Sequence, residues 1–216
     1  MRSGVVVDAV QIKDGADTLD ADLHLPEDAR GLIVFAHGSG SSRFSSRNRQ
    51  VAEFLNKGHF ATLLLDLLTQ AEERIDVRTA EFRFDIPLLG RRVVTAADWA
   101  AAHSLLRELP IGYFGASTGA AAALIAAAQR PHAMAVVSRG GRPDLAGNAL
   151  PLVRAPTLLI VGGDDHPVIE MNESAMRQMI APVELAIVPR ATHLFEEPGT
   201  LEEVERLALD WFNRHV

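Results

Sequence analysis

The sequence of 216 residues contains no cysteine. Disulfide bonds, thiolate metal sites and a cysteine nucleophile are therefore excluded together, while the redox compartment stays open. The histidines and carboxylates also lack an H-E-x-x-H spacing or a comparable arrangement of metal ligands. We therefore expect neither a metal ion nor another cofactor.

Positive charge is scarce, with 21 lysines and arginines against 28 aspartates and glutamates and a net charge of −7. Proteins that bind nucleic acids normally need a basic surface, so this balance argues against a nucleic-acid partner. The hydrophobic share of 48% and the charged share of 23% are typical of a soluble globular protein. A chain of this length predicts one domain over residues 1–216, as a monomer or a homodimer.

Long hydrophobic runs are almost absent. The N-terminal segment lacks the apolar stretch of a signal peptide, so we expect a cytoplasmic location. Residues 111–128 carry no charge and approach the length of a membrane span. Glycines interrupt the start of this run, and Ser117 and Thr118 lie inside it. We therefore predict a strand followed by a helix here, and no membrane partner.

Short apolar runs alternate with longer helical segments along the chain. Strands are predicted at residues 5–12, 19–25, 31–38, 61–68, 111–116, 133–138, 157–162 and 184–189, the first two as a hairpin. Helices are predicted at residues 46–57, 85–109, 117–129, 168–179 and 199–215. Strands that alternate with helices indicate βαβ crossovers, and so an α/β fold with a doubly wound, mainly parallel sheet.

One charged segment follows an early strand, at the end of the sheet where loops carry function. Thr69 and Glu72 have the spacing of a capping box, which predicts a short helix after Thr69. The segment from Thr69 to Phe84 is the best candidate for a mobile lid.

The stretch GYFGASTGAAAAL, residues 112–124, contains the pattern G-x-S-x-G around Ser117. A serine on a sharp strand-to-helix turn needs neighbours without side chains, and Gly115 and Gly119 meet that need. Close packing of a strand and a helix would explain the pattern equally well if it stood alone. A phosphate-binding loop is disfavoured because the glycines do not have G-x-G-x-x-G spacing.

Two later strand ends supply the partners that a serine nucleophile requires. The base must be a histidine held by a carboxylate, and in this fold class the chain order is serine, acid, histidine. Asp164 and Asp165 follow one strand, and His193 follows the next. We favour Asp165 because Asp164 is the better turn-capping candidate. His166 is the rival base, but it adjoins the acid in sequence.

The segment FAHGSGSS, residues 35–42, follows the strand ending near Ala36. In hydrolases with a serine on such a turn, two backbone N–H groups donate to the oxyanion. The residue after the nucleophile supplies the first, and the loop after this early strand supplies the second. We predict that the N–H groups of Ser39 and Thr118 form this oxyanion hole, with Gly40 as a substitute donor that also contacts substrate. His37 opens the same loop but precedes the serine, which is the wrong order for the base.

Four arginines fall on loops at the same end of the predicted sheet. Fork-like hydrogen bonds from such arginines could hold a substrate carboxylate or phosphate. We expect instead that most pair with nearby acids, and that Arg139 is the exception that binds substrate. The arginines are Arg43, Arg47, Arg139 and Arg142, and the acids are Asp66, Asp144 and Glu196.

From residue 31 onward the chain resembles the α/β-hydrolases, and within them the small dienelactone hydrolase-like group, including members fused to phosphoribosyltransferase domains. The resemblance rests on FAHGSGSSRFSSRN, ATLLLDLLT, RFDIPLLGRR, GYFGASTGAAAAL, SRGGRPDLAG, APTLLIVGGDDHPVIE and ATHLFEEPGTLEEV. It implies an eight-stranded, mainly parallel sheet with helices on both faces. Ser117, Asp165 and His193 would be its catalytic triad.

Two departures from the family pattern bear on function. Dienelactone hydrolases proper use a cysteine nucleophile, so the resemblance implies hydrolase chemistry without implying their substrate. Arg190 stands where relatives often have a glycine.

The residues between the strands at 133–138 and 157–162 are too few for a cap domain.

The sequence thus predicts a serine hydrolase that cleaves small carboxylic esters or lactones. Two alternatives stay open: an acyltransferase that uses the same triad, and a binding or regulatory module whose triad is idle.

Overall fold

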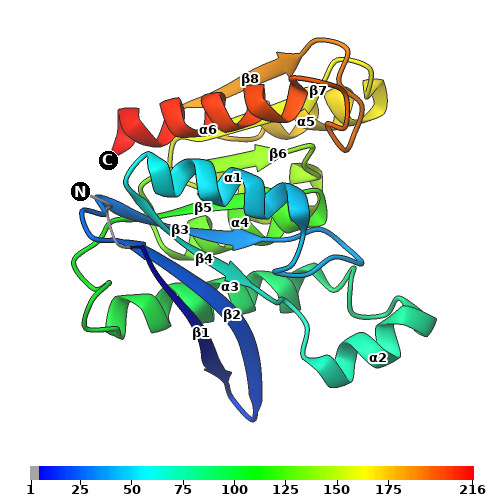
Figure 1. The fold of residues 1–216 in the computed structure, drawn as a ribbon. Helices are drawn as coiled ribbons and strands as arrows, with labels where there is room; N and C mark the ends of the chain where they lie inside the picture. The colour runs from blue at the N-terminus through cyan, green and yellow to red at the C-terminus, as the bar shows by residue number, and fades with distance from the viewer. Residues whose placement is uncertain (1–4) are drawn as a thin grey trace.

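The computed structural model describes residues 5–216. Residues 1–4 lie outside the described part. They are the start of the predicted domain and of the N-terminal segment in which the sequence shows no signal peptide. The strands form one sheet in the order β1-β2-β4-β3-β5-β6-β7-β8 (Figure 1). Their bounds are β1 Val5–Asp14, β2 Asp17–Pro26, β3 Gly31–Ala36, β4 Phe60–Leu65, β5 Ile111–Ala116, β6 Val136–Arg139, β7 Thr157–Gly162 and β8 Val183–Val188.

Parallel pairing dominates this sheet. The β1–β2 hairpin is antiparallel and β2 pairs antiparallel with β4, whereas β4, β3, β5, β6, β7 and β8 are mutually parallel. Strands β3, β4 and β7 are buried along their whole length, as their continuous apolar runs predict. The predicted hairpin and the mainly parallel eight-stranded sheet are confirmed.

Helices cover both faces of the sheet (Figure 1). α1 and α6 pack together over one face, where the core holds the large aromatic side chains of Phe35, Phe114 and Trp211. α3, α4 and α5 lie over the other face, whose core consists mainly of alanine, leucine and valine. The bounds are α1 Ser46–Lys57, α2 Gln70–Thr79, α3 Ile86–Ala102, α4 Thr118–Gln129, α5 His166–Met176 and α6 Thr200–His215.

The helix predicted from Asp85 to about Leu109 is shorter than expected. Asp85 caps its start, as predicted, but α3 ends at Ala102. His103 adopts an extended conformation, and the turns that follow bring Leu106 to a fully buried position. The chain therefore leaves the helix at His103, and the turns after it place Leu106 in the core.

The connection between β6 and β7 holds only a 3-10 helix, η1, at Pro143–Leu152. The sequence prediction missed this element. Pro151 inside the element and a kink at Gly147 with φ of 50° prevent a regular α-helix. As predicted, no cap domain occupies this connection.

The alanine-rich run after β5 forms α4, which is buried on nearly every side within the protein. Among residues 5–216, no helix combines the length and apolar character needed to cross a membrane. The predicted strand and helix are therefore what this uncharged segment forms.

Candidate active site

Ser117 lies on the sharp turn between β5 and α4, with φ of 51° and ψ of −123°. Its neighbours leave no room for side chains. A Cβ on Gly115 would lie 2.4 Å from the Ala120 Cα, and one on Gly119 would lie 2.2 Å from the Ala36 carbonyl oxygen. The G-x-S-x-G pattern is therefore required by the turn itself, which holds Ser117 in a strained conformation.

Asp165 and His193 meet across two loops at the carboxyl end of the sheet. His193 Nδ1 lies 2.7 Å from Asp165 Oδ2. A carboxylate only accepts hydrogen bonds, so Nδ1–H donates and the Nε2 lone pair is left free to take a proton. The Asp165 side chain is 14% exposed and that of His193 is 39% exposed. A largely buried acid thus orients an accessible imidazole.

The preference for Asp165 over Asp164 assumes that Asp164 takes the capping position, and the structure contradicts that assumption. Asp165 itself stands at the N-cap position of α5, but its side chain forms no capping hydrogen bond. The carboxylate turns toward His193 instead. His166, the rival base, is an exposed residue at the start of α5.

The loop that carries His193 is held by its own side chains. Glu197 accepts hydrogen bonds from the Thr192 hydroxyl, at 2.6 Å, and from the Thr192 N–H, at 3.1 Å. Phe195 has a positive φ of 55° and buries its ring in the core. Arg190, where relatives often have glycine, adopts a φ of 62°. The loop keeps its left-handed turn there without a glycine.

The predicted oxyanion loop after β3 is tied down by His37. Its Nε2 accepts a hydrogen bond from the Leu67 N–H at 3.0 Å, and its Nδ1 donates to the Gly38 carbonyl at 2.8 Å. Burial lowers the pKa of His37, which keeps this bridging imidazole neutral. From the sequence alone His37 is only a base in the wrong order, because its contact with Leu67 joins residues 30 positions apart.

The same loop approaches Ser117 closely. A Cβ on Gly38 would lie 3.1 Å from the Ser117 Cβ. Thr118 is the first residue of α4, and within residues 5–216 neither its N–H nor that of Ser39 donates to a protein acceptor in the turns and loops. Both predicted oxyanion donors are thus unused. Gly40 lies farther along, next to the guanidinium of Arg83.

The segment after β6 brings the serine and histidine loops together. The Ser117 N–H donates to the Arg139 carbonyl at 3.2 Å, and the Arg142 N–H donates to the Ser117 carbonyl at 3.0 Å. A Cβ on Gly140 would lie 3.0 Å from the His193 carbonyl oxygen. No hydrogen bond joins the Ser117 hydroxyl to His193 in the described residues. Such bonds often tighten only when substrate binds.

Three of the four loop arginines pair with acids, as predicted. Arg43 binds Asp66, Arg47 binds Glu196 at 3.1 Å and Arg142 binds Asp144 at 2.8 Å. Arg139 differs. Its side chain is buried, no carboxylate within residues 5–216 pairs with it, and its Nη2 donates to the Asn48 side chain at 3.2 Å. Gly40 and Arg139 stay predictions as substrate contacts.

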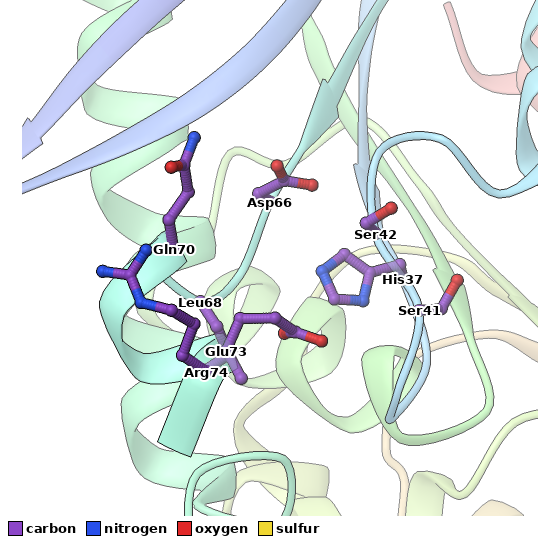
Figure 2. Close-up of a pocket in the computed structure, with 8 residues that line it drawn as sticks. All are labelled: His37, Ser41, Ser42, Asp66, Leu68, Gln70, Glu73 and Arg74. Carbon is purple, nitrogen blue, oxygen red and sulfur yellow. The ribbon is translucent and has the colours of Figure 1, made fainter. Parts of the chain in front are cut away.

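A cavity of about 400 Å³ lies between the predicted oxyanion loop and α2. Figure 2 shows Glu73 extending from α2 toward His37, with Asp66 and Ser42 beside them. Ser117, Asp165 and His193 do not line it. Within the candidate lid, Thr69 to Phe84, α2 begins at the predicted Thr69–Glu72 capping box. Movement of this lid stays a prediction.

Metal ligands are not gathered at this site. Over the described range, 5–216, no cluster of three or more histidine, aspartate or glutamate side chains could hold a metal ion.

Known proteins similar to this chain fall into two groups. Two Mycobacterium tuberculosis proteins, from strains CDC 1551 and H37Rv, are provisionally named phosphoribosyl transferases and are 55% identical over 208 residues. That match covers 96% of this chain but 46% of theirs, so the chain spans about half the length of these relatives.

Solved structures give the second group. A dienelactone hydrolase from Anabaena variabilis is 56% identical, with a TM-score of 0.96, over 98% of this chain and 99% of that one. Est1E from Butyrivibrio proteoclasticus shares the fold at 17% identity, with a TM-score of 0.79 over 96% of this chain and 98% of its own. The sequence also matches the dienelactone hydrolase family over residues 19–216. The chain therefore belongs to the dienelactone hydrolase family.

Proposed function

We propose that the protein is a serine hydrolase that cleaves small carboxylic esters or lactones, with Ser117, His193 and Asp165 as its triad. The observation that carries the proposal is the 2.7 Å hydrogen bond between His193 Nδ1 and Asp165. This hydrogen bond orients His193 as a base at the strand end where the sequence predicts one. The predicted nucleophile, Ser117, stands on a strained turn. Family membership supports hydrolase chemistry in general.

In the first half of the reaction His193 Nε2 takes the proton of the Ser117 hydroxyl, and the serine oxygen attacks the substrate carbonyl carbon. The negative charge that develops on the carbonyl oxygen is stabilised by the N–H groups of Thr118 and Ser39. The tetrahedral intermediate then collapses. The bond to the leaving oxygen breaks, and that oxygen takes the proton from His193, which leaves an acyl-serine.

In the second half water replaces the leaving alcohol. His193 takes a proton from water, the hydroxide attacks the acyl carbon, and the same two N–H groups hold the oxyanion. Collapse releases the carboxylic acid and returns the proton to Ser117. Asp165 stabilises the imidazolium at each stage. An alcohol or thiol in place of this water would make the same site an acyltransferase.

The longer Mycobacterium relatives do not alter this assignment. Their transferase name describes proteins of which this chain matches about half. We propose that the hydrolase activity belongs to the matched half and the transferase activity to the remainder.

The test is hydrolysis of p-nitrophenyl acetate and butyrate by the wild type and by Ser117→Ala, from pH 5 to 9. We expect kcat/KM to fall by about 10⁴-fold or more in the variant, because no other group can form the acyl-enzyme. Ser174→Ala, on α5, is the matched control and should keep full activity. A fluorophosphonate probe should label the wild type and Ser174→Ala but not Ser117→Ala.

Equal inactivity of the wild type and Ser117→Ala, together with no fluorophosphonate labelling, would contradict the proposal. The binding or regulatory module with an idle triad would then become the better account.

A further inference from the structure

α5 carries an amide side chain at a fully buried position. Asn172 is 0% exposed and lies on the inner face of this helix, together with Val168 and Ala175. Its Nδ2 donates to the Gly141 carbonyl at 3.0 Å and to the Val168 carbonyl at 2.8 Å. Its Oδ1 is buried, and no group within residues 5–216 donates a hydrogen bond to it. An unpaired buried oxygen costs free energy and asparagine is a poor helix former, so the stability of α5 alone does not explain this residue.

The carbonyl of Gly141 depends on Asn172 for its hydrogen bond. Gly141 is buried, and a Cβ on it would lie 1.9 Å from Ser138 Oγ and 2.6 Å from Ala120 Cβ. The residue is thus wedged between β6 and α4. Among the turns and loops of residues 5–216, no main-chain N–H donates to its carbonyl. A buried carbonyl without a donor is strongly disfavoured, so the Asn172 amide fixes where this segment lies.

The neighbours of Gly141 in the chain touch two members of the proposed triad. Arg142, the next residue, donates its N–H to the Ser117 carbonyl at 3.0 Å. Gly140, the residue before, packs against the main chain of His193, where an added Cβ would lie 3.0 Å from the carbonyl oxygen. The segment held by the Asn172 amide therefore lies between the nucleophile and the base.

α5 itself begins at the third member of the proposed triad. The carbonyl of Asp165, its N-cap residue, accepts the N–H of Val168 at 3.1 Å. Asn172 binds the Val168 carbonyl in the next turn. Hydrogen bonds thus connect Asp165, through α5 and Asn172, to the segment that holds Ser117. The side chain of Asp165 in turn holds His193.

We propose that Asn172 is a positioning residue that sets the distance between Ser117 and the His193–Asp165 pair by tying α5 to Gly141. This proposal rests on the proposed hydrolase function. Because Asn172 is fully buried, it does not touch substrate and acts only through the segment it holds. Without its amide the Gly141 carbonyl loses its donor, and the segment is free to shift against α5. A shift of about 1 Å between reacting groups lowers a rate about 10²-fold.

The first variant is Asn172→Leu, which keeps nearly the same volume and removes the donor. Hydrolysis of p-nitrophenyl butyrate is followed well below the Tm of each protein. We expect kcat to fall about 10²-fold while KM stays close to that of the wild type, because the spacing of the reacting groups changes and the substrate contacts do not. The fluorophosphonate probe should label Ser117 more slowly by a similar factor.

Asn56→Leu is the matched control. Asn56 lies on α1 and is 9% exposed, and its Nδ2 donates to the Phe60 carbonyl at 2.9 Å and to the Thr62 hydroxyl at 3.1 Å. It thus makes the same number of hydrogen bonds at a comparable depth, but it holds β4 and no loop of the triad. We expect Asn56→Leu to lower Tm and to keep the wild-type kcat.

Asn172→Ser separates the two hydrogen bonds of the amide. A serine hydroxyl inside a helix bonds the carbonyl four residues earlier, which here is that of Val168. Its side chain is one bond shorter than that of asparagine, so it does not extend to Gly141. We expect Asn172→Ser to lose kcat as Asn172→Leu does. This second variant also keeps the proposal testable if Asn172→Leu does not fold.

Three outcomes would overturn the proposal. Wild-type kcat in folded Asn172→Leu would show that the spacing does not depend on the amide. An equal fall of kcat in Asn56→Leu would reduce the effect to general destabilisation. Wild-type kcat in Asn172→Ser would mean that the bond inside α5 suffices.

The proposed function is tested separately, by the wild type alone. A wild type that neither hydrolyses the ester nor takes the probe removes the hydrolase function, and the role of Asn172 with it. An active wild type with unchanged variants removes only the role of Asn172.

Discussion

Strained main-chain conformations occur at five residues other than glycine within residues 5–216, and three of them lie on loops of the candidate active site. They are Ser117, Arg190 and Phe195. Left-handed conformations cost L-residues about 1–2 kcal/mol each, so they persist only where the surroundings enforce them. At Ser117 the enforcement comes from the close contacts of Gly115 and Gly119. The strained conformations that lower the stability of the fold thus lie on the loops where we expect the chemistry.

Ser117→Gly should therefore stabilise the fold while it removes the nucleophile. Glycine adopts φ of 51° and ψ of −123° without the steric penalty that Ser117 and Ser117→Ala both carry. We expect the free energy of unfolding of Ser117→Gly to exceed that of Ser117→Ala by up to about 1 kcal/mol, once the greater entropy of unfolded glycine is counted. Urea unfolding of the two variants is the measurement. A lower value for Ser117→Gly would mean that the elbow is not strained.

At the scale of elements, α4 shows how the nucleophile turn is packed. The helix is built largely from alanine, which allows close approach to the sheet and to α3. One close contact with α3 is at Gly90, where an added Cβ would lie 2.6 Å from Ile125 Cγ2 and 2.9 Å from Ile125 Cβ. Rotation of Ile125 cannot relieve a contact at its own Cβ. Gly90 is required by the neighbouring helix.

Gly90→Ala should thus destabilise the protein even though alanine is the better helix former by about 1 kcal/mol. Overpacking of this kind costs about 1–3 kcal/mol. In an Ile125→Ala background the contact with Cγ2 is gone while the contact with Cβ remains, so Gly90→Ala should destabilise the protein clearly less than in the wild type. A double-mutant cycle by urea unfolding measures this coupling. Additive effects of the two substitutions would show that α3 and α4 are not locked at this contact.

At the scale of the whole molecule, one buried cation joins three separate parts of the chain. Arg92 on α3 is fully buried and binds Asp14 and Asp17 at the β1–β2 turn and Glu72 in the first turn of α2. Burial alone would raise the pKa of Glu72, but hydrogen bonds from Arg92 and Thr69 outweigh it and lower that pKa. The network fastens the hairpin and the candidate lid helix to the body of the protein.

Glu72→Gln should lower the free energy of unfolding by about 1–3 kcal/mol at pH 7. The pKa of Glu72 in the folded protein is below its usual 4.5. Near pH 4.5 the unfolded chain therefore binds more protons than the folded protein does. The stabilisation is therefore present above pH 4.5 and is lost as pH falls through the folded pKa. Urea unfolding at pH 7 and at pH 3 to 4 should show the difference from the wild type shrinking in acid.

Glu73→Gln is the matched control because Glu73 lies in the same first turn, and in the described residues it makes no ion pair. An equal loss of stability in both variants would mean that Glu72 acts only through the helix dipole.

Local patterns were enough to predict much of this molecule. Continuous apolar runs give β5 and β7 with correct bounds, and the spacing of Thr69 and Glu72 gives the capping box. The order of Ser117, Asp165 and His193 at successive strand ends leads to a pair that does form a hydrogen bond across 28 positions. These signals are readable because each depends on near neighbours or on the fixed order of parallel strands.

Features set by distant contacts could not be predicted in this way. The early end of α3 depends on where Leu106 meets the core, and the network of Arg92 depends on acids far away in sequence. The solitary charge of Arg139 became visible only when its neighbours were placed, because an arginine without a partner looks like any other in a sequence. Tertiary contacts decide all three.

The two hydrogen bonds that join Ser117 to the end of β6 and to the residues just after it also limit where the chain can be lengthened. Since the Arg139 carbonyl and the Arg142 N–H hold both main-chain groups of Ser117, any segment inserted before Arg142 would displace the elbow. Beyond it the restriction ends. At Gly147, where η1 kinks and an added Cβ would meet nothing within 4 Å, extra residues could extend outward into solvent. A larger hydrolase could be built from this chain by lengthening it there.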